Sequence, residues 1–335
     1  MKNLKFLAPK PLPFDFGDWK KQAFPQRVKM LCTAWATQGY GAPVSAYGFY
    51  LLKIIFYVAM WLYFCSFSTN LGLAGNFAEW WFMPEALLKF VLWSILFEVL
   101  GLGCGSGPLT ARYFPPMGGA LHFARPGTIK LPLFTKLPLI GGDKRNLLDV
   151  ALYLGLLLFL LRALVSTEVT PQMLLPIALI IPVLGLFDKT IFLAARAEHY
   201  LIALICFLFP GEEIAGAKVV WLAIWWGAAT SKLNRHFPAV ICVMISNHGI
   251  LRWPWLRKKM YKNYPEDLRP GKLAHILAHA GTIVEYSFPL ILALGSGGQL
   301  TIIGLAIMLG FHIYITSSVP VGVPQEWKGV ILSGG

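Results

Sequence analysis

The sequence predicts an all-α fold: a polytopic transmembrane helical bundle of about eight spans, with a long Pro-rich interfacial or re-entrant loop. Composition supports this first, because 56% of the 335 residues are hydrophobic and only 13% are charged. A water-soluble domain carries about 25% charge. The 32 glycines, 23 prolines and 12 tryptophans suit helices that break, pack closely and anchor at interfaces. This composition excludes soluble α/β enzymes and disulfide-rich secreted domains.

The positions of the spans follow from length, because a helix needs about 20 apolar residues to cross roughly 30 Å of hydrocarbon. A basic arm, residues 1–47, comes first, a single transmembrane domain covers residues 48–322, and a tail follows at 323–335. Between the fourth and fifth spans, Asp188 to His199 is compatible with a tight hairpin or a broken helix. The predicted spans are 48–68, 84–104, 146–166, 172–191, 195–211, 214–233, 273–295 and 300–320.

The distribution of Lys and Arg supports this count independently. Cations accumulate in the arm, in 105–145, around 189–196 and in 234–272, whereas 69–83, 167–171 and 295–299 contain none. Because cytoplasmic loops carry the excess of Lys and Arg, we expect both termini to be cytoplasmic in the cell (inner) membrane. This bias explains the net charge of +13 without a nucleic-acid partner.

Two connections are too long to be simple turns. Residues 105–145 combine a high density of proline with apolar side chains, which favours a segment on the membrane face or dipping into it. Residues 234–272 contain aromatic side chains beside cations, a pattern that an anionic membrane surface attracts. We favour interfacial anchoring, with membrane lipids as the partner, over a protein or nucleic-acid site. The anchoring residues are Trp253, Trp255, Arg257, Lys258 and Lys259.

The seventh span carries several polar residues along one helical stripe. At 100° per residue, His275, His279, Thr282 and Tyr286 lie close together, and Glu285 lies about 80° from their axis. A histidine pair one turn apart can chelate a metal only with further ligands. The two are therefore weak metal candidates, and a polar packing stripe, a proton relay or a substrate cavity are the alternatives.

Three other spans contribute candidate groups. Lys232 follows a run of small residues at the end of the sixth span, where it either extends to the interface or is held desolvated as a general base. The eighth span contributes His312, and the second contributes Glu98. Ionisable residues inside a membrane are expensive, so they are functional candidates unless they pair with each other.

Three segments together resemble a known family: Gly227-Ala-Ala-Thr-Ser-Lys232-Leu-Asn234, Gly281-Thr-Ile-Val-Glu285-Tyr-Ser-Phe-Pro289 and Gly310-Phe-His312. Over residues 215–318 the chain is similar to the vitamin K-dependent gamma-carboxylase-like (HTTM) superfamily, whose bacterial members are integral membrane proteins. The resemblance implies that Lys232 is the base that deprotonates a reduced quinone, and that Glu285 and His312 are recurrent intramembrane polar positions.

Two departures limit this resemblance. The large soluble domain of the animal carboxylase is absent, and the predicted topology puts Lys232 at the cytoplasmic end, whereas the animal enzyme works on the lumenal side. The leading hypothesis is a membrane-embedded enzyme acting on a quinone or acyl lipid, with a quinone or bound lipid as the implied cofactor. A transporter or permease subunit is one alternative. A non-catalytic subunit that binds partner membrane subunits is the other.

Overall fold

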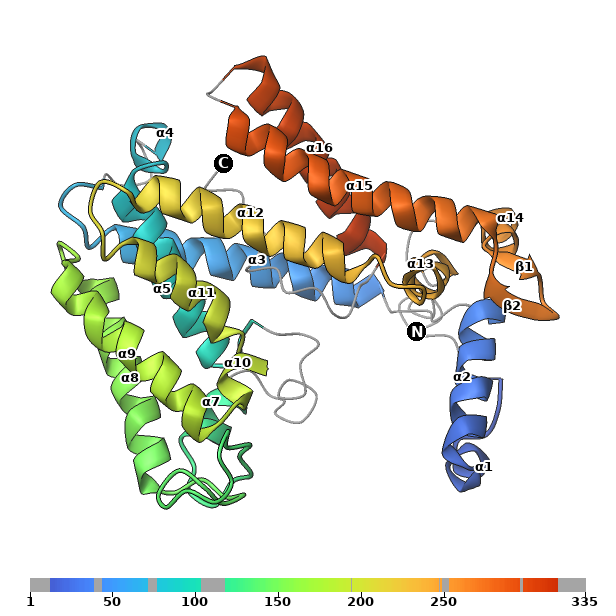
Figure 1. The fold of residues 1–335 in the computed structure, drawn as a ribbon, viewed down its shortest axis with the longest axis horizontal. Helices are drawn as coiled ribbons and strands as arrows, with labels where there is room; N and C mark the ends of the chain where they lie inside the picture. The colour runs from blue at the N-terminus through green and yellow to red at the C-terminus, as the bar shows by residue number, and fades with distance from the viewer. Residues whose placement is uncertain are drawn as a thin grey trace, which may run out of the picture. The chain divides into compact units, whose positions relative to one another are not determined.

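The computed structural model describes residues 13–38, 44–71, 77–103, 118–193, 195–246, 248, 253–295 and 298–318. These residues form helices and one two-stranded hairpin (Figure 1). The first twelve residues of the basic arm, residues 104–117 of the Pro-rich connection and the tail 323–335 lie outside the described residues.

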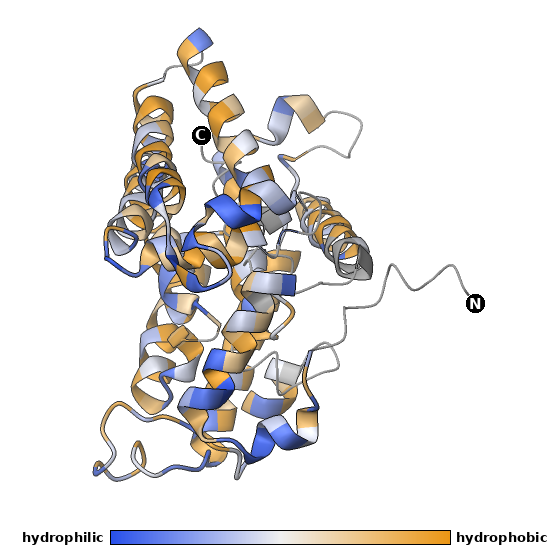
Figure 2. Cartoon of the chain, turned by 90° about the vertical axis from the view of Figure 1, so that its right-hand side faces the viewer, coloured by the Kyte–Doolittle hydropathy of each residue, from blue (hydrophilic) through white to orange (hydrophobic). Residues whose placement is uncertain are grey.

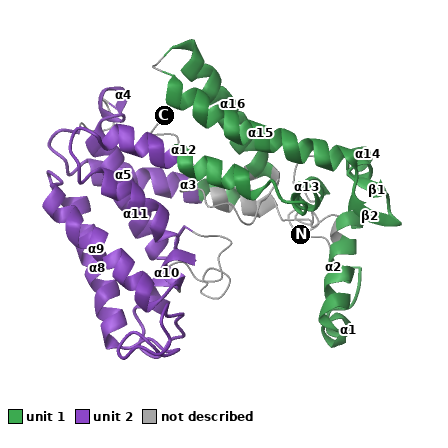
Figure 3. Ribbon diagram, in the orientation of Figure 1, with its two compact units in different colours: residues 1–52, 222–321 green, residues 53–221, 322–335 purple. Residues whose placement is uncertain are grey.

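The chain divides into two compact units (Figure 3). Unit 1 contains residues 1–52 and 222–321, and unit 2 contains residues 53–221 and 322–335. The chain passes from one unit to the other within α3 (Val44–Cys65) and again within α12 (Glu213–Ser231). Each unit is described separately below.

Unit 2 is built around α5 (Pro84–Val99), on which every side chain from Ala86 to Val99 is buried. A helix that is apolar on all sides belongs at the centre of a bundle. The part of α3 in this unit contacts α5 through tryptophans: Trp61 Nε1 donates to the Ala86 carbonyl at 3.1 Å, and Trp93 Nε1 to the Tyr57 carbonyl at 3.0 Å. The remaining helices are α4 (Phe77–Trp80), α7 (Gly118–Phe123), α8 (Leu147–Val165), α9 (Pro171–Phe187), α10 (Thr190–Leu193) and α11 (Ala197–Cys206).

A fully buried lysine joins the ends of two helices in unit 2. Lys89 Nζ donates to the carbonyl oxygens of Phe64 at 3.2 Å, Leu164 at 2.7 Å and Ser166 at 2.7 Å. These carbonyls belong to the last turns of α3 and α8, where helices leave acceptors unsatisfied and where the dipole favours a cation. An ammonium has three donors, so Lys89 satisfies three such acceptors at once.

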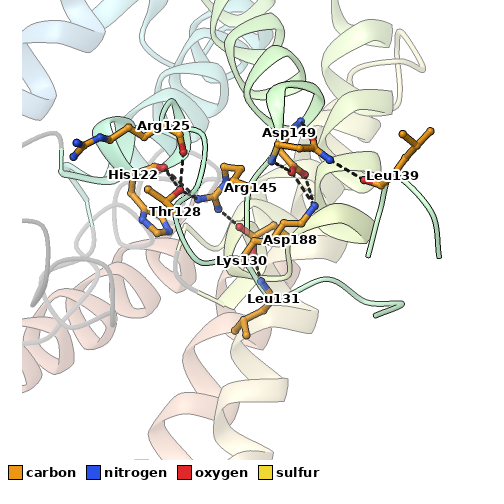
Figure 4. A network of polar contacts seen from close by, with 10 residues as sticks. His122, Arg125, Thr128, Lys130, Leu131, Leu139, Arg145, Asp149 and Asp188 are labelled. Atoms are coloured by element: carbon orange, nitrogen blue, oxygen red, sulfur yellow. Dashed lines mark hydrogen bonds and ion pairs between the residues drawn. The ribbon is translucent and has the colours of Figure 1, made fainter. Parts of the chain in front are cut away.

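At the opposite end of α8, a network of buried charges fixes the loop that precedes the helix (Figure 4). Lys130 Nζ contacts both carboxylate oxygens of Asp149, at 3.0 and 2.8 Å, and Arg145 forms an ion pair with Asp188 just beyond α9. Asp149 also completes a capping box with Asn146 at the start of α8. The network therefore fastens the loop to the ends of both helices.

The same loop exposes apolar side chains. Between the network residues Lys130 and Arg145, the chain carries five exposed large apolar residues in nine positions. The cations Lys136 and Lys144 are exposed beside them. Part of the predicted Pro-rich segment is thus an apolar loop held by buried ion pairs. The exposed apolar residues are Leu131, Leu133, Phe134, Leu137 and Leu139.

Unit 1 has its own core, formed where α13 (Phe237–Ser246), the hairpin and α15 (Lys272–Leu294) meet. In the hairpin, the guanidinium of Arg269 hydrogen-bonds the carboxylate of Asp267 and lowers the pKa of that carboxyl to about 2. Burial raises the pKa of Tyr261, which shares a hydrogen bond of 2.7 Å with Ser246, to about 12. The other elements are α1 (Phe16–Lys21), α2 (Phe24–Gln38), α14 (Pro254–Lys259), β1 (Tyr261–Asn263), β2 (Asp267–Pro270) and α16 (Gln299–Ser318).

A helix overlaps each of the eight predicted spans, namely α3, α5, α8, α9, α11, α12, α15 and α16. Figure 2 shows many hydrophobic residues along the helices of the chain. Among the described residues, only α8 and α15 are long and apolar enough to cross a membrane. At ten residues α11 is about 15 Å long, half the thickness of the hydrocarbon. Within Asp188 to His199, the short α10 follows the end of α9, and α11 begins at Ala197. Eight crossings remain a prediction.

We expect Asp188→Asn to lower the free energy of unfolding by about 3 kcal/mol, because it leaves the buried Arg145 guanidinium without a carboxylate. Thermal unfolding of the purified protein in detergent measures this. Asp143→Asn is the matched control, since Asp143 is an exposed residue of the same loop and should change the stability by no more than about 0.5 kcal/mol. Equal destabilisation by both variants would contradict the ion pair.

Candidate functional site

The candidate site lies in unit 1, where the end of α12 meets α15. The run Gly227-Ala228-Ala229 carries no bulky side chain, and Lys232 follows the last residue of the helix. On α15, buried residues recur every three or four positions, which is the pattern of a helix with one face packed. Glu285 is one of these buried residues and lies on the packed face of α15.

Lys232 Nζ forms an ion pair and a hydrogen bond with Glu285 Oε1. The two side chains differ in exposure: that of Lys232 is 26% exposed and that of Glu285 only 1%. The Lys232 ammonium also lies 5.9 Å from the centre of the Phe237 ring. The structure therefore brings together two of the three predicted catalytic residues.

The second oxygen of Glu285 is buried and, among the described residues, accepts no hydrogen bond. A buried carboxylate oxygen without a donor is costly, so such atoms are rare and call for an explanation. A donor from water or from a bound molecule would satisfy it, and a proton on this oxygen would remove its charge. Glu285 therefore retains the capacity to take part in proton transfer while it is paired.

Farther along, ring contacts connect α12 with both α15 and α16. The Trp225 ring lies edge-on to Phe288, with ring centres 4.8 Å apart, and edge-on to His312 at 5.1 Å. Trp225 precedes Lys232 by seven residues and Phe288 follows Glu285 by three, so these pairs share helix faces. The His312 Nδ1 atom lies 2.6 Å from the Met308 carbonyl, which only accepts, so Nδ1 carries a proton, and in the neutral ring Nε2 is the acceptor.

Tyr286, the residue after Glu285, also contacts α12. Its hydroxyl shares a hydrogen bond of 2.6 Å with Thr230 Oγ1, and its carbonyl accepts from Trp226 Nε1 at 3.2 Å. Thr282, by contrast, is buried and donates to the Ala278 carbonyl one turn earlier, at 3.0 Å. Of the predicted relay residues on α15, Tyr286 is thus joined to α12, and Thr282 bonds within its own helix.

The remaining predicted residues lie elsewhere. His275 and His279 are exposed on α15, and no group of three His, Cys, Asp or Glu side chains in the described ranges is arranged to hold a metal ion. Glu98 is buried on α5 and belongs to unit 2. Gly103 makes room for it, since a Cβ there would lie 2.5 Å from Glu98 Cδ.

The predicted anchoring residues divide into two groups. Trp253 and Trp255 are 53% and 55% exposed and stack with ring centres 5.9 Å apart, and Lys258 and Lys259 are also exposed. Arg257 instead donates to the Thr37 carbonyl at the end of α2, at 3.0 Å. Its position fastens α14 to α2, a role that the sequence did not indicate.

Comparison with known proteins identifies one family. A family model described as "Transmembrane protein of unknown function (DUF3556)" matches residues 4–333. No curated protein and no solved structure matches the chain. The match supports a protein integral to a membrane, whereas the resemblance to the carboxylase-like superfamily receives no support from it and stays a hypothesis.

If the pair holds α12 and α15 together, Lys232→Met should lower the apparent Tm by about 5 °C, because it leaves the Glu285 carboxylate buried without a cation. The double variant Lys232→Met/Glu285→Met should recover at least about half of this loss, since two apolar side chains need no partner. Thermal unfolding in detergent measures both.

Lys218→Met is the control for the lost lysine, because Lys218 lies on the same helix and forms no ion pair within the described residues. A double variant as unstable as Lys232→Met alone would show that the two side chains are not coupled.

Proposed function

The chain belongs to the DUF3556 family of transmembrane proteins, and we propose that it is a membrane-embedded enzyme acting on a lipid-soluble substrate, a quinone or an acyl lipid. The observation that carries this proposal is the Lys232–Glu285 ion pair, with one carboxylate oxygen left without a donor among the described residues. Intramembrane ionisable groups are retained where a site needs them.

The pairing refines the role of Lys232. A lysine bound to a carboxylate is an ammonium and cannot accept a proton. Transfer of that proton from Lys232 Nζ to Glu285 leaves a neutral amine and a neutral carboxylic acid, which removes the charge from the buried Glu285 side chain. The amine then takes a proton from an acidic hydroxyl or C–H group of the substrate. Lys232 and Glu285 thus act as one proton-transferring couple.

The neighbouring side chains have supporting roles in this scheme. In the neutral ring the Nε2 atom of His312 is the acceptor, so His312 is suited to orient a hydroxyl or relay a proton. Trp225 and Phe288 are buried and pack edge-on against each other, and Trp225 packs edge-on against His312, so they hold the imidazole ring in place. Tyr286 fixes the spacing of α12 and α15 through Thr230.

We also propose that two surfaces lie at the membrane boundary. The exposed apolar loop held by Lys130 and Arg145, and the stacked Trp253 and Trp255, combine apolar side chains with exposed lysines. Such combinations favour the headgroup region of a bilayer. With both termini cytoplasmic, these surfaces and Lys232 would face the cytoplasmic leaflet.

Native mass spectrometry with lipid extraction, on protein purified in mild detergent, tests the enzyme proposal. We expect a stoichiometric quinone or acyl lipid that is lost in Lys232→Ala and Glu285→Gln but retained in Lys218→Ala. A host phenotype that depends on the protein should fail in the first two variants only.

The proposal is wrong if Lys232→Ala stays folded, keeps its bound molecule and fully rescues the host. An empty protein that co-purifies with another membrane subunit would also overturn it, and would favour the non-catalytic subunit.

A further inference from the structure

Unit 1 contains a groove that none of the proposed catalytic residues lines. Its volume is about 630 Å³, within the range of about 300–1,000 Å³ that is usual for small-molecule sites. The walls are mostly apolar and come from α13, α14, the first turns of α15 and the last turns of α16. The lining residues that the argument uses are Ile245, Trp255, Lys259, Lys272, Ile276 and Tyr314.

Close packing around Gly271 brings the two lysines of the groove to one edge. A Cβ on Gly271 would lie 2.8 Å from the Tyr261 carbonyl oxygen and 3.2 Å from that of Lys259, so only glycine permits this approach. The Gly271 amide donates to the Met260 carbonyl at 2.8 Å. The end of α14 is thereby held against the start of α15, where Lys272 is the first residue.

The charge at this edge is uncompensated. Within the described residues, neither Lys259 nor Lys272 forms an ion pair, and Lys272 adds its charge to the positive end of the α15 dipole. The Lys259 ammonium lies 5.7 Å from the Trp255 ring centre, an arrangement typical of a membrane interface. An anion is the ligand that suits this edge.

Beyond the lysines the groove becomes apolar. Ile276 lies one turn farther along α15 than Lys272, a rise of about 6 Å, and Ile245 and Tyr314 face the same space from α13 and α16. α15 is long and apolar enough to cross a membrane, and in a crossing helix this direction would lead from the headgroup level into the hydrocarbon. The groove therefore pairs a cationic edge with an apolar part that follows a candidate membrane span.

We propose that this groove binds one anionic phospholipid, with the phosphate at Lys259 and Lys272 and an acyl chain along Ile276 and Tyr314. A zwitterionic lipid can have the same acyl chains, but it carries no net negative charge to attract the two lysines. Each lysine near a membrane surface attracts anionic lipid by about 1 kcal/mol, so two of them favour the anionic lipid by about thirtyfold.

The test is native mass spectrometry of the full chain with added dioleoylphosphatidylglycerol or dioleoylphosphatidylcholine. We expect the wild type to bind the glycerol lipid at least about tenfold more tightly than the choline lipid. Lys259→Gln/Lys272→Gln should lose this preference. The control Lys29→Gln/Lys262→Gln removes the same charge from exposed positions of unit 1 that do not line the groove, and should change affinity by less than about twofold.

A second variant tests the apolar part. Ile276→Trp fills this part of the groove and keeps both lysines, so it should weaken binding of the glycerol lipid about tenfold, and glycerol 3-phosphate alone should not displace the lipid. Lys232→Met should leave binding of the added glycerol lipid unchanged, while the separate quinone or acyl lipid expected at Lys232 is lost. The two bound molecules thus distinguish the groove from the proposed active site. No preference in the wild type, an equal loss in the control pair, or full binding by Ile276→Trp would each overturn the proposal.

Discussion

The structure depends on one constraint: a charge or backbone polar group placed among apolar helices must find its partner inside the protein. Among the described residues, the cations buried most completely are Lys89, Lys130 and Arg145, and each is satisfied at a helix end. Lys89 binds carbonyls, whereas the other two bind carboxylates. Helix ends are where acceptors and dipoles are available, so buried charge there joins two elements at once.

The Lys232–Glu285 pair differs from these structural charges. Asp149 and Asp188 use both carboxylate oxygens in contacts with the loop and helix ends. Glu285 uses one, and its second oxygen is buried without a donor in the described part of the chain. A pair that only held helices together would gain from satisfying that oxygen. Because the second oxygen of Glu285 can still accept a proton or a hydrogen bond, we assign the proposed chemistry to this pair and not to the pairs of Asp149 and Asp188.

Much of the helical pattern could be predicted from apolar length, and a helix overlaps every predicted span. The juxtaposition of Lys232 and Glu285 needed the fold, because nothing in one sequence fixes which faces of α12 and α15 meet. The charge count included Lys130 and Arg145 among the cations of the 105–145 connection, and the structure shows that both are buried with aspartates at helix ends. Helical spacing put His275 and Thr282 on one stripe of α15, yet His275 is exposed and Thr282 is buried. Spacing along one helix does not show which of its turns are covered by other helices.

The most direct test is to exchange the two charges, in Lys232→Glu/Glu285→Lys, and to measure co-purified quinone or acyl lipid together with the Tm. A structural ion pair works in either direction, whereas a proton-transferring couple requires the amine and the carboxyl at defined positions. Our account predicts a folded protein, within a few degrees of the wild-type Tm, that has lost its bound molecule. Retention of both the molecule and the Tm would show that the pair only joins helices.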